Sequence, residues 1–265
     1  MDKLKSNKPI ILIANIALML LAFFFYAKTF PAQWQKVMIW LLPDSDDLMR
    51  VVEVRAWLNG QGFFDLINHR ANPPIGTEMH WSRLSDLPLA IGEIIFRQFT
   101  DVNMAERLAV FWTPVVLLII FASINGITAN KIFKGNFTFA IAFFFTILCD
   151  STFTSFAAGR VDHHSLQLIS LSVMMFGLIS QNFKGGIIAG LSLAASLTIG
   201  FEMLPLQIWA VAWVAIIWAF KGESKNQLVF GFRLALSIGL LAGFAINVAP
   251  SQYLNGVNDR LSIAN

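Results

Sequence analysis

The segment from Gly159 to His164, with the sequence GRVDHH, places a cation, a carboxylate and two imidazoles next to each other. Residues 137–149 before it and residues 166–178 after it are almost entirely apolar. Ionisable side chains beside a membrane-spanning stretch are costly, so their presence indicates a functional site. We therefore expect residues 159–164, called the Asp-His-His segment below, to carry chemistry.

The side chains of Asp162, His163 and His164 are suitable ligands for divalent ions such as Mn²⁺, Mg²⁺ or Zn²⁺. Neighbouring residues of a helix point about 100° apart, so His163 and His164 cannot face one ion from a regular helix. In a loop, Asp162 and His164 can reach the same ion. The alternative is structural, because aspartate is a preferred first residue of helices and Asp162 can cap the helix that follows.

A second polar cluster, formed by Asp44, Asp46, Asp47 and Arg50, follows the first long apolar stretch. Such carboxylates commonly bind a divalent cation that in turn binds phosphate or diphosphate. Asp46 and Asp47 are also candidates to orient or deprotonate an acceptor. Alternatively, the sequence Pro-Asp-Ser-Asp-Asp that begins at Pro43 is ordinary helix-start chemistry with an acidic first turn. The sequence alone leaves both interpretations open.

Arginines and one glutamate complete the candidate site. Arg50, Arg83 and Arg160 can bind a phosphate in a bidentate manner, and attraction to anionic lipid headgroups is the alternative. Glu202 lies in a turn between two apolar stretches. It is a candidate additional carboxylate or general base, and the alternative is an exposed side chain at the membrane interface.

The composition is that of an integral membrane protein. The chain is 56% hydrophobic with a formal net charge of +3, and its mean hydropathy is +0.64. The modest charge argues against a nucleic-acid partner. The sequence has one cysteine, Cys149, which excludes a disulfide within the chain and a cysteine-based metal site.

The apolar stretches predict an all-α, polytopic bundle of transmembrane helices. A spanning helix needs about 20 mostly apolar residues. About seven stretches qualify or come close, namely residues 9–30, 105–127, 137–158, 166–180, 186–201, 205–220 and 228–248. We expect one transmembrane domain over residues 1–265, in a native protein that continues beyond Asn265.

Residues 31–104 are polar and contain most of the arginines, which predicts a long external loop. The helix expected after Pro43, and a second over residues 87–99, are amphipathic and suited to the bilayer surface. Lys3, Lys5 and Lys8 place the N-terminus in the cytoplasm. With this topology the acidic cluster, the Asp-His-His segment and Glu202 share the outer face of the membrane.

These motifs resemble the GT-C class of membrane glycosyltransferases, and most of all the N-terminal transmembrane part of the oligosaccharyltransferase catalytic subunit. That family carries, in its first external loop, an Asp followed six residues later by an Arg, and Asp44 and Arg50 have this spacing. A Pro-x-Gly turn further along the loop is similar to residues 74–76. A Ser/Thr-rich approach, Ala-Gly and then Asp-x-Glu mark the second external loop. Residues 154–164 fit this pattern, with His164 at the glutamate position.

The resemblance implies a divalent metal, Mn²⁺ or Mg²⁺, bound by Asp44 and Asp162. It also implies a polyprenyl-(di)phosphate sugar donor, an acceptor, and transfer at the periplasmic or extracellular face of a bacterial inner membrane. The chain departs from the family in carrying His164 in place of glutamate and in the extra carboxylates Asp46 and Asp47. It also lacks the family's C-terminal acceptor-recognition motif, so the resemblance does not extend to transfer onto asparagine.

Two other functions are compatible with these residues. In an ion-coupled transporter, Glu202, Asp150 and Asp162 would form a cation path. That function requires charges near the middle of the bilayer and repeated halves with broken helices, whereas the charges here gather at one predicted surface. A non-catalytic, lipid-binding membrane subunit is the other alternative.

Overall fold

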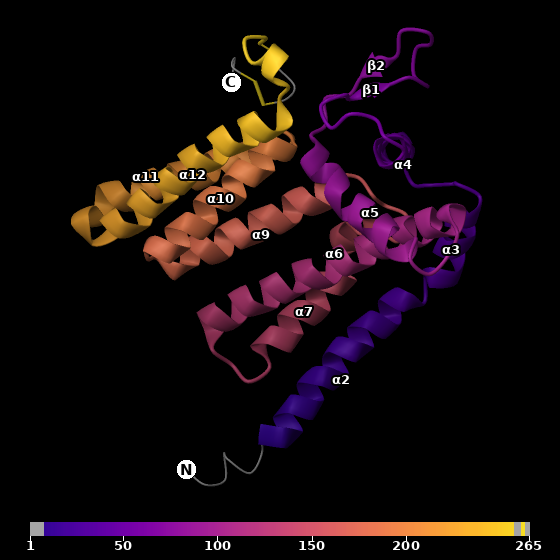
Figure 1. The fold of residues 1–265 in the computed structure, drawn as a ribbon. Coiled ribbons are helices and arrows are strands. Elements are labelled where there is room, and N and C mark those ends of the chain that lie inside the picture. The colour runs from indigo at the N-terminus through magenta and orange to yellow at the C-terminus, as the bar shows by residue number, and fades with distance from the viewer. Residues whose placement is uncertain (1–7, 257–260, 263–265) are drawn as a thin grey trace.

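The computed structural model describes residues 8–256 and 261–262 and is mostly helical (Figure 1). Lys3 and Lys5, used above to orient the chain, lie outside the described residues. Among these described residues, three helical stretches are long and apolar enough to cross a membrane: α2 (Lys8–Ala27), α6 (Val102–Phe133) and the stretch Leu204–Asn247. The last stretch is made of α11 (Leu204–Lys221), the 3-10 turn η1 (Gly222–Lys225) and α12 (Asn226–Asn247).

Shorter apolar helices complete the bundle, namely α7 (Thr138–Leu148), α9 (His164–Ser180) and α10 (Phe183–Ile199). The expectation of one helix over residues 137–158 is wrong. Cys149 adopts an extended conformation with ψ of 128°, and a separate short helix, α8 (Asp150–Ser155), follows it. The hydroxyl groups of Thr154 and Ser155 donate to the carbonyl of Ser151. These local hydrogen bonds lie at the end of α8 and compete with its continuation beyond Ser155.

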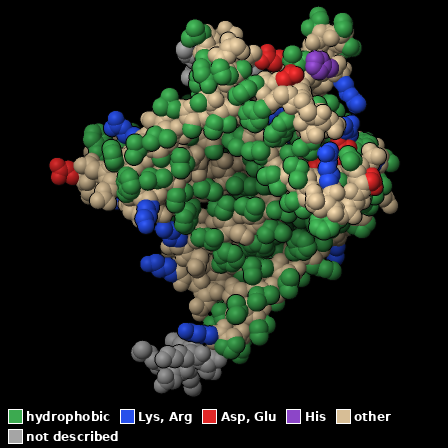
Figure 2. Space-filling view, viewed as in Figure 1, with side chains coloured by type: hydrophobic (Ala, Val, Ile, Leu, Met, Phe, Trp, Pro, Cys, Tyr) green, Lys and Arg blue, Asp and Glu red, His purple; other side chains and the backbone are tan. Residues whose placement is uncertain are grey.

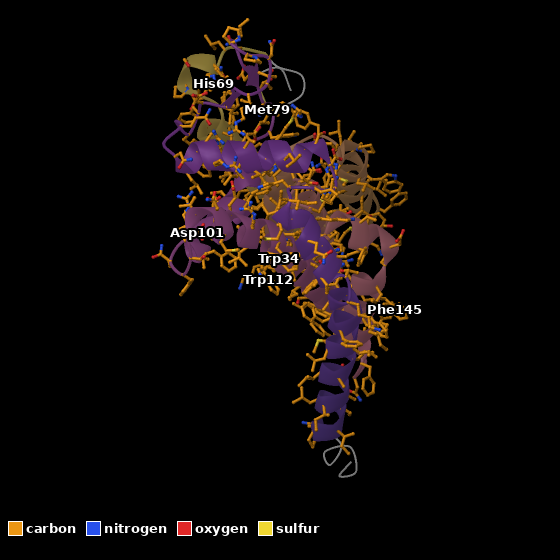
Figure 3. The ribbon with its side chains drawn as sticks, turned by 90° about the vertical axis from the view of Figure 1, so that its right-hand side faces the viewer. Trp34, His69, Met79, Asp101, Trp112 and Phe145 are labelled. Carbon is orange, nitrogen blue, oxygen red and sulfur yellow. The ribbon has the colours of Figure 1, made fainter. Side chains whose placement is uncertain are left out.

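The polar region after α2 is an ordered layer of short elements. It contains α3 (Phe30–Met38), α4 (Ser45–Leu58) and α5 (Arg83–Phe96), with a hairpin of β1 (Ile67–Asn68) and β2 (Thr77–Glu78) between the last two. The antiparallel hairpin corrects the purely all-α expectation. It lies at the opposite end of the molecule from the start of α2, as His69 and Met79 show in Figure 3.

The helices pack around two apolar cores. One core joins α2, α6 and α7 to the polar layer, and the other joins α9, α10, α11 and α12. Gly186 and Gly190 of α10 face the backbone of α12, where a Cβ atom would collide with backbone oxygens of Leu228 and Phe232. Small residues of this kind let helices approach closely in membranes. Hydrophobic side chains cover the middle of the visible face, and charged ones gather towards its ends (Figure 2).

The loop before α9 is tied to helices from earlier in the chain. The hydroxyl of Tyr26 in α2 donates to the carbonyl of Phe156 at 2.7 Å, and the amide of Gly159 donates to the carbonyl of Val110 in α6 at 3.2 Å. Gly159 itself has φ of 96°, a backbone conformation that glycine adopts without strain. These contacts fix the loop that carries the Asp-His-His segment against α2 and α6.

Candidate functional site

The acidic cluster forms the first turn of α4. Asp44 is the N-cap residue, and Asp44 and Asp47 form a capping box in which the Asp47 carboxylate accepts from the amide of Asp44 at 3.1 Å. The structural interpretation of this cluster is therefore correct as far as it goes. The carboxylate of Asp46 accepts from the hydroxyl of Ser45 at 3.4 Å and stays at the edge of the cluster. Asp47, in contrast, is fully buried.

Asp47 and Arg160 join the acidic cluster to the Asp-His-His segment. Asp47 Oδ1 accepts from the amides of Val161 and Asp162 at 2.8 and 2.9 Å. The Arg160 guanidinium lies 3.2 Å from both Asp44 Oδ2 and Asp47 Oδ2, and 3.4 Å from Asp162 Oδ2. Two segments more than a hundred residues apart in sequence thus share one set of charges.

Arg50, one turn further along α4, is completely buried beneath this set. Its Nη1 atom donates to Ser85 Oγ and to Asp86 Oδ1, both at 2.6 Å, so α5 supplies its main partners. Its Nη2 atom lies 3.4 Å from His163 Nδ1 and 4.0 Å from Asp162 Oδ1. Its guanidinium carbon also lies 4.8 Å from the centre of the Trp81 ring, a cation–π distance.

Arg83 is placed differently from the other candidate phosphate-binding arginines. It is 2% exposed, and its guanidinium binds Asp86 at 3.0 Å and the carbonyls of Asp65 and Phe63. Its hydrogen bonds hold the loop before the hairpin to the start of α5. We therefore assign Arg83 to the support of Asp86 and Arg50.

The Asp-His-His segment lies just before and at the start of α9. His163 is the N-cap residue, so Asp162 does not cap this helix as the alternative interpretation required. His163 Nδ1 lies 2.5 Å from Asp162 Oδ1, and its Nε2 lies 3.0 Å from Glu202 Oε1. His164 Nε2 lies 3.6 Å from Asp162 Oδ2. Gln167 on α9 donates to Glu202 at 2.6 Å and fixes that carboxylate.

Burial and ion pairing shift the pKa values of these groups in opposite directions. Burial favours protonation of Asp162, but the hydrogen bond and charge of His163 outweigh it and hold the pKa of Asp162 well below its usual range. Against the effect of burial, hydrogen bonds to Asp162 and Glu202 raise the pKa of His163. Burial raises the pKa of Asp47 to about 6, although Arg160 opposes the shift. The carboxylates of Asp162 and Glu202 and the imidazole of His163 thus stabilise each other's charged forms.

The donor atoms of the Asp-His-His segment also fit a divalent metal. One ligand atom from each of Asp162, His163 and His164 lies within 4.8 Å of the others. The Nδ1 atom of His164 is buried and has no hydrogen-bond partner among the described residues. A carboxylate with two imidazoles is a donor set for Mn²⁺ or Zn²⁺ more than for Mg²⁺. Asp44 does not belong to this group of candidate ligands. The Arg160 guanidinium contacts both Asp44 and Asp162 and so joins the two carboxylates in place of a shared metal ion.

Most of the sequence-predicted residues come together, and the structure adds further members. Asp44, Asp47 and Arg50 meet the Asp-His-His segment directly, and Glu202 meets it through His163. Sequence reasoning missed the supporting residues Ser85, Asp86, Trp81 and Gln167. No local pattern marks them, because each acts through a partner distant in sequence. No family model, curated protein or solved structure matches this chain.

Proposed function

We propose that this chain is a GT-C-type membrane glycosyltransferase. It moves a sugar or oligosaccharide from a polyprenyl-(di)phosphate donor to an acceptor at the outer face of a bacterial inner membrane. The observation that carries the proposal is the meeting of Asp47 with the amides of Val161 and Asp162, which joins the acidic cluster to a metal-compatible Asp-His-His group. Helices long and apolar enough to cross a membrane support a lipid-linked donor.

The phosphate of the donor requires positive charge, and the site has two cations in suitable positions. Arg160 is 16% exposed at its side chain and is held by carboxylates on both segments. We assign it to bind the donor phosphate, exchanging its contact with the exposed Asp44 for a phosphate oxygen. Arg50 is fully buried and adds positive charge on the interior side of the site, where its guanidinium contacts His163.

The carboxylates divide into structural and reactive groups by exposure. Asp47 is buried and holds the two segments together. Asp44 is 45% exposed at its side chain and Asp46 is partly exposed, so we assign these two carboxylates to the acceptor. Either carboxylate can orient an acceptor hydroxyl and accept its proton.

A divalent ion would be held by Asp162, His163 and His164, with Glu202 supporting His163 through its Nε2 atom. Such an ion would supply positive charge for the departing lipid phosphate. Asp162 and His163 are both buried, so the ligand atoms would be shielded from bulk water. The described ligand set favours Mn²⁺ over the Mg²⁺ that the family resemblance also allows.

The test uses purified full-length chain in lipid nanodiscs with a polyprenyl-phosphate-linked radioactive sugar and membrane extract as the source of acceptor. We expect Asp162→Asn and Asp44→Asn each to lower the transfer rate by about 100-fold or more. Asp101→Asn is the matched control, because Asp101 caps α6 through the amides of Asn103 and Met104 and asparagine caps equally well. Full activity in both site variants would overturn the proposal.

A further inference from the structure

A polar pocket lies between α4 and the β-hairpin and has a volume of about 260 Å³. Helix α4 contributes Glu53, Arg55 and Asn59 to its wall, and the hairpin side contributes Asn68 and Arg70. None of its lining residues belongs to the Asp-His-His segment or to the acidic cluster. The pocket is therefore a separate feature of the polar layer.

Glu53 is the unusual residue of this pocket. It is only 5% exposed, and its Oε1 atom is buried without a hydrogen-bond partner among the described residues. The nearby guanidinium groups of Arg50 and Arg83 are bound to Asp86 at 2.6 and 3.0 Å instead. A buried polar atom without a partner is rare in native proteins and calls for an explanation, such as a bound molecule.

The pocket is lined by mixed hydrogen-bond donors and acceptors. Burial, assisted by the charge of Asp86, raises the pKa of Glu53 to about 8 and so favours its neutral carboxyl group, a form that both donates and accepts. Both Arg55 contacts go to Glu106, at 2.7 and 2.8 Å. The amide groups of Asn59 and Asn68 add further donors and acceptors.

We propose that this pocket binds a single sugar ring through its hydroxyl groups, with Glu53 as the main partner. A hydroxyl group both donates and accepts, which matches a neutral carboxyl and side-chain amides better than an anion would. Apolar side chains of Val52, Ala56 and Leu66 line part of the pocket and suit the C–H faces of a sugar. The volume lies below the roughly 300–1,000 Å³ of pockets for drug-sized ligands, so one ring is the expected occupant.

The inference goes beyond the proposed transfer reaction, because sugar binding here requires neither the metal nor a donor. The pocket is nevertheless linked to the candidate site: Arg83 lines it and binds Asp86, which in turn binds Arg50. Loss of sugar binding with transfer intact, or the reverse, therefore separates the two proposals.

Saturation-transfer NMR on the full-length chain in nanodiscs tests the pocket, with glucose, galactose and N-acetylglucosamine as separate probes. We expect at least one sugar to give a signal that falls about tenfold in Glu53→Leu and is kept in Glu53→Gln, which preserves a neutral hydrogen-bonding group. Asn59→Ala changes an exposed residue and should weaken the signal without affecting folding. The control is Glu223→Gln, an exposed glutamate of η1.

If no sugar gives a signal that Asn59→Ala and Glu53→Leu weaken, the pocket holds water alone. Inorganic phosphate is added as a competitor in the same experiment. If phosphate displaces the sugar signal and Arg70→Ala abolishes that effect, the pocket binds anions and the assignment to hydroxyl groups is wrong.

Discussion

The carboxylate of Asp47 accepts the backbone amide of Asp162 at 2.9 Å, and this contact joins segments separated by 115 residues. The same oxygen accepts the amide of Val161 at 2.8 Å, so the backbone beside the Asp-His-His group is fixed on two consecutive residues. A helix-capping residue of α4 therefore also sets the position of Asp162. The first turn of α4 acts as capping structure and as part of the site at once.

Replacing Asp47 with alanine should destabilise the protein by about 3 kcal/mol, because it leaves two buried amides without their acceptor and removes one of the carboxylates that pair with Arg160. Thermal unfolding in detergent measures the effect as a lower melting temperature. Asp46→Ala, two residues from the N-cap in the same turn, should change the stability by only a few tenths of a kcal/mol. Equal stability of the two variants would contradict the anchoring role of Asp47.

Replacing Arg50 with methionine should cost about 3 kcal/mol, because the buried Asp86 then loses its partner at 2.6 Å and keeps only its contact with Arg83 at 3.0 Å. Asp86→Asn alone should also destabilise, since Arg50 and Arg83 both bind this carboxylate. The double variant should be more stable than the sum of the two single changes predicts. Strict additivity in the melting data would show that the two side chains do not interact.

The contribution of Glu53 to the free energy of unfolding should fall as the pH rises from about 4.5 to about 8. The pKa of Glu53 is raised by burial and by Asp86, with Arg50 and Arg83 opposing, from 4.5 to about 8. The folded state therefore keeps a proton that the unfolded state has released over this range, and the slope is negative. Glu53→Gln cannot ionise and should remove this slope. Identical pH profiles of the two proteins would refute the shift.

Metal binding should depend on the second imidazole of the Asp-His-His segment. We expect Mn²⁺, followed by electron paramagnetic resonance, to bind the wild-type chain and to bind His164→Ala about tenfold or more weakly, since one of three ligands is lost. His69→Ala removes an exposed histidine at the hairpin (Figure 3) and is the matched control. Unchanged Mn²⁺ affinity in His164→Ala would remove that residue from the ligand set.

Hydropathy and helix-start signals predicted much of the fold, because they depend on local sequence. The apolar runs correspond to the observed helices, and Asp44 marks the start of α4 as expected. The break at Cys149 and the hairpin of Ile67–Asn68 with Thr77–Glu78 were not predicted. The break involves one residue and each strand has two residues. Hydrophobic periodicity gives no signal over such short lengths.

The site was predictable where topology alone brings residues together. Placing Asp44, Arg50 and Asp162 on the same side of the predicted bundle was enough to anticipate their meeting. The role of Arg83 was not predictable, because its hydrogen bonds to the carbonyls of Phe63 and Asp65 depend on how the preceding loop packs against the start of α5. The buried Oε1 atom of Glu53, which has no hydrogen-bond partner among the described residues, is likewise a consequence of tertiary packing.

The account is tested most directly by measuring sugar transfer from a polyprenyl-phosphate donor by the purified chain before and after metal chelation. We predict that chelation abolishes transfer, that added Mn²⁺ restores it in the wild type and in Asp101→Asn, and that Asp162→Asn stays inactive at every Mn²⁺ concentration. An ion-coupled transporter would instead accumulate a solute in proteoliposomes without transferring sugar. Transfer by Asp162→Asn at the wild-type rate, or the absence of any transfer in the wild type with Mn²⁺, would contradict the central claim.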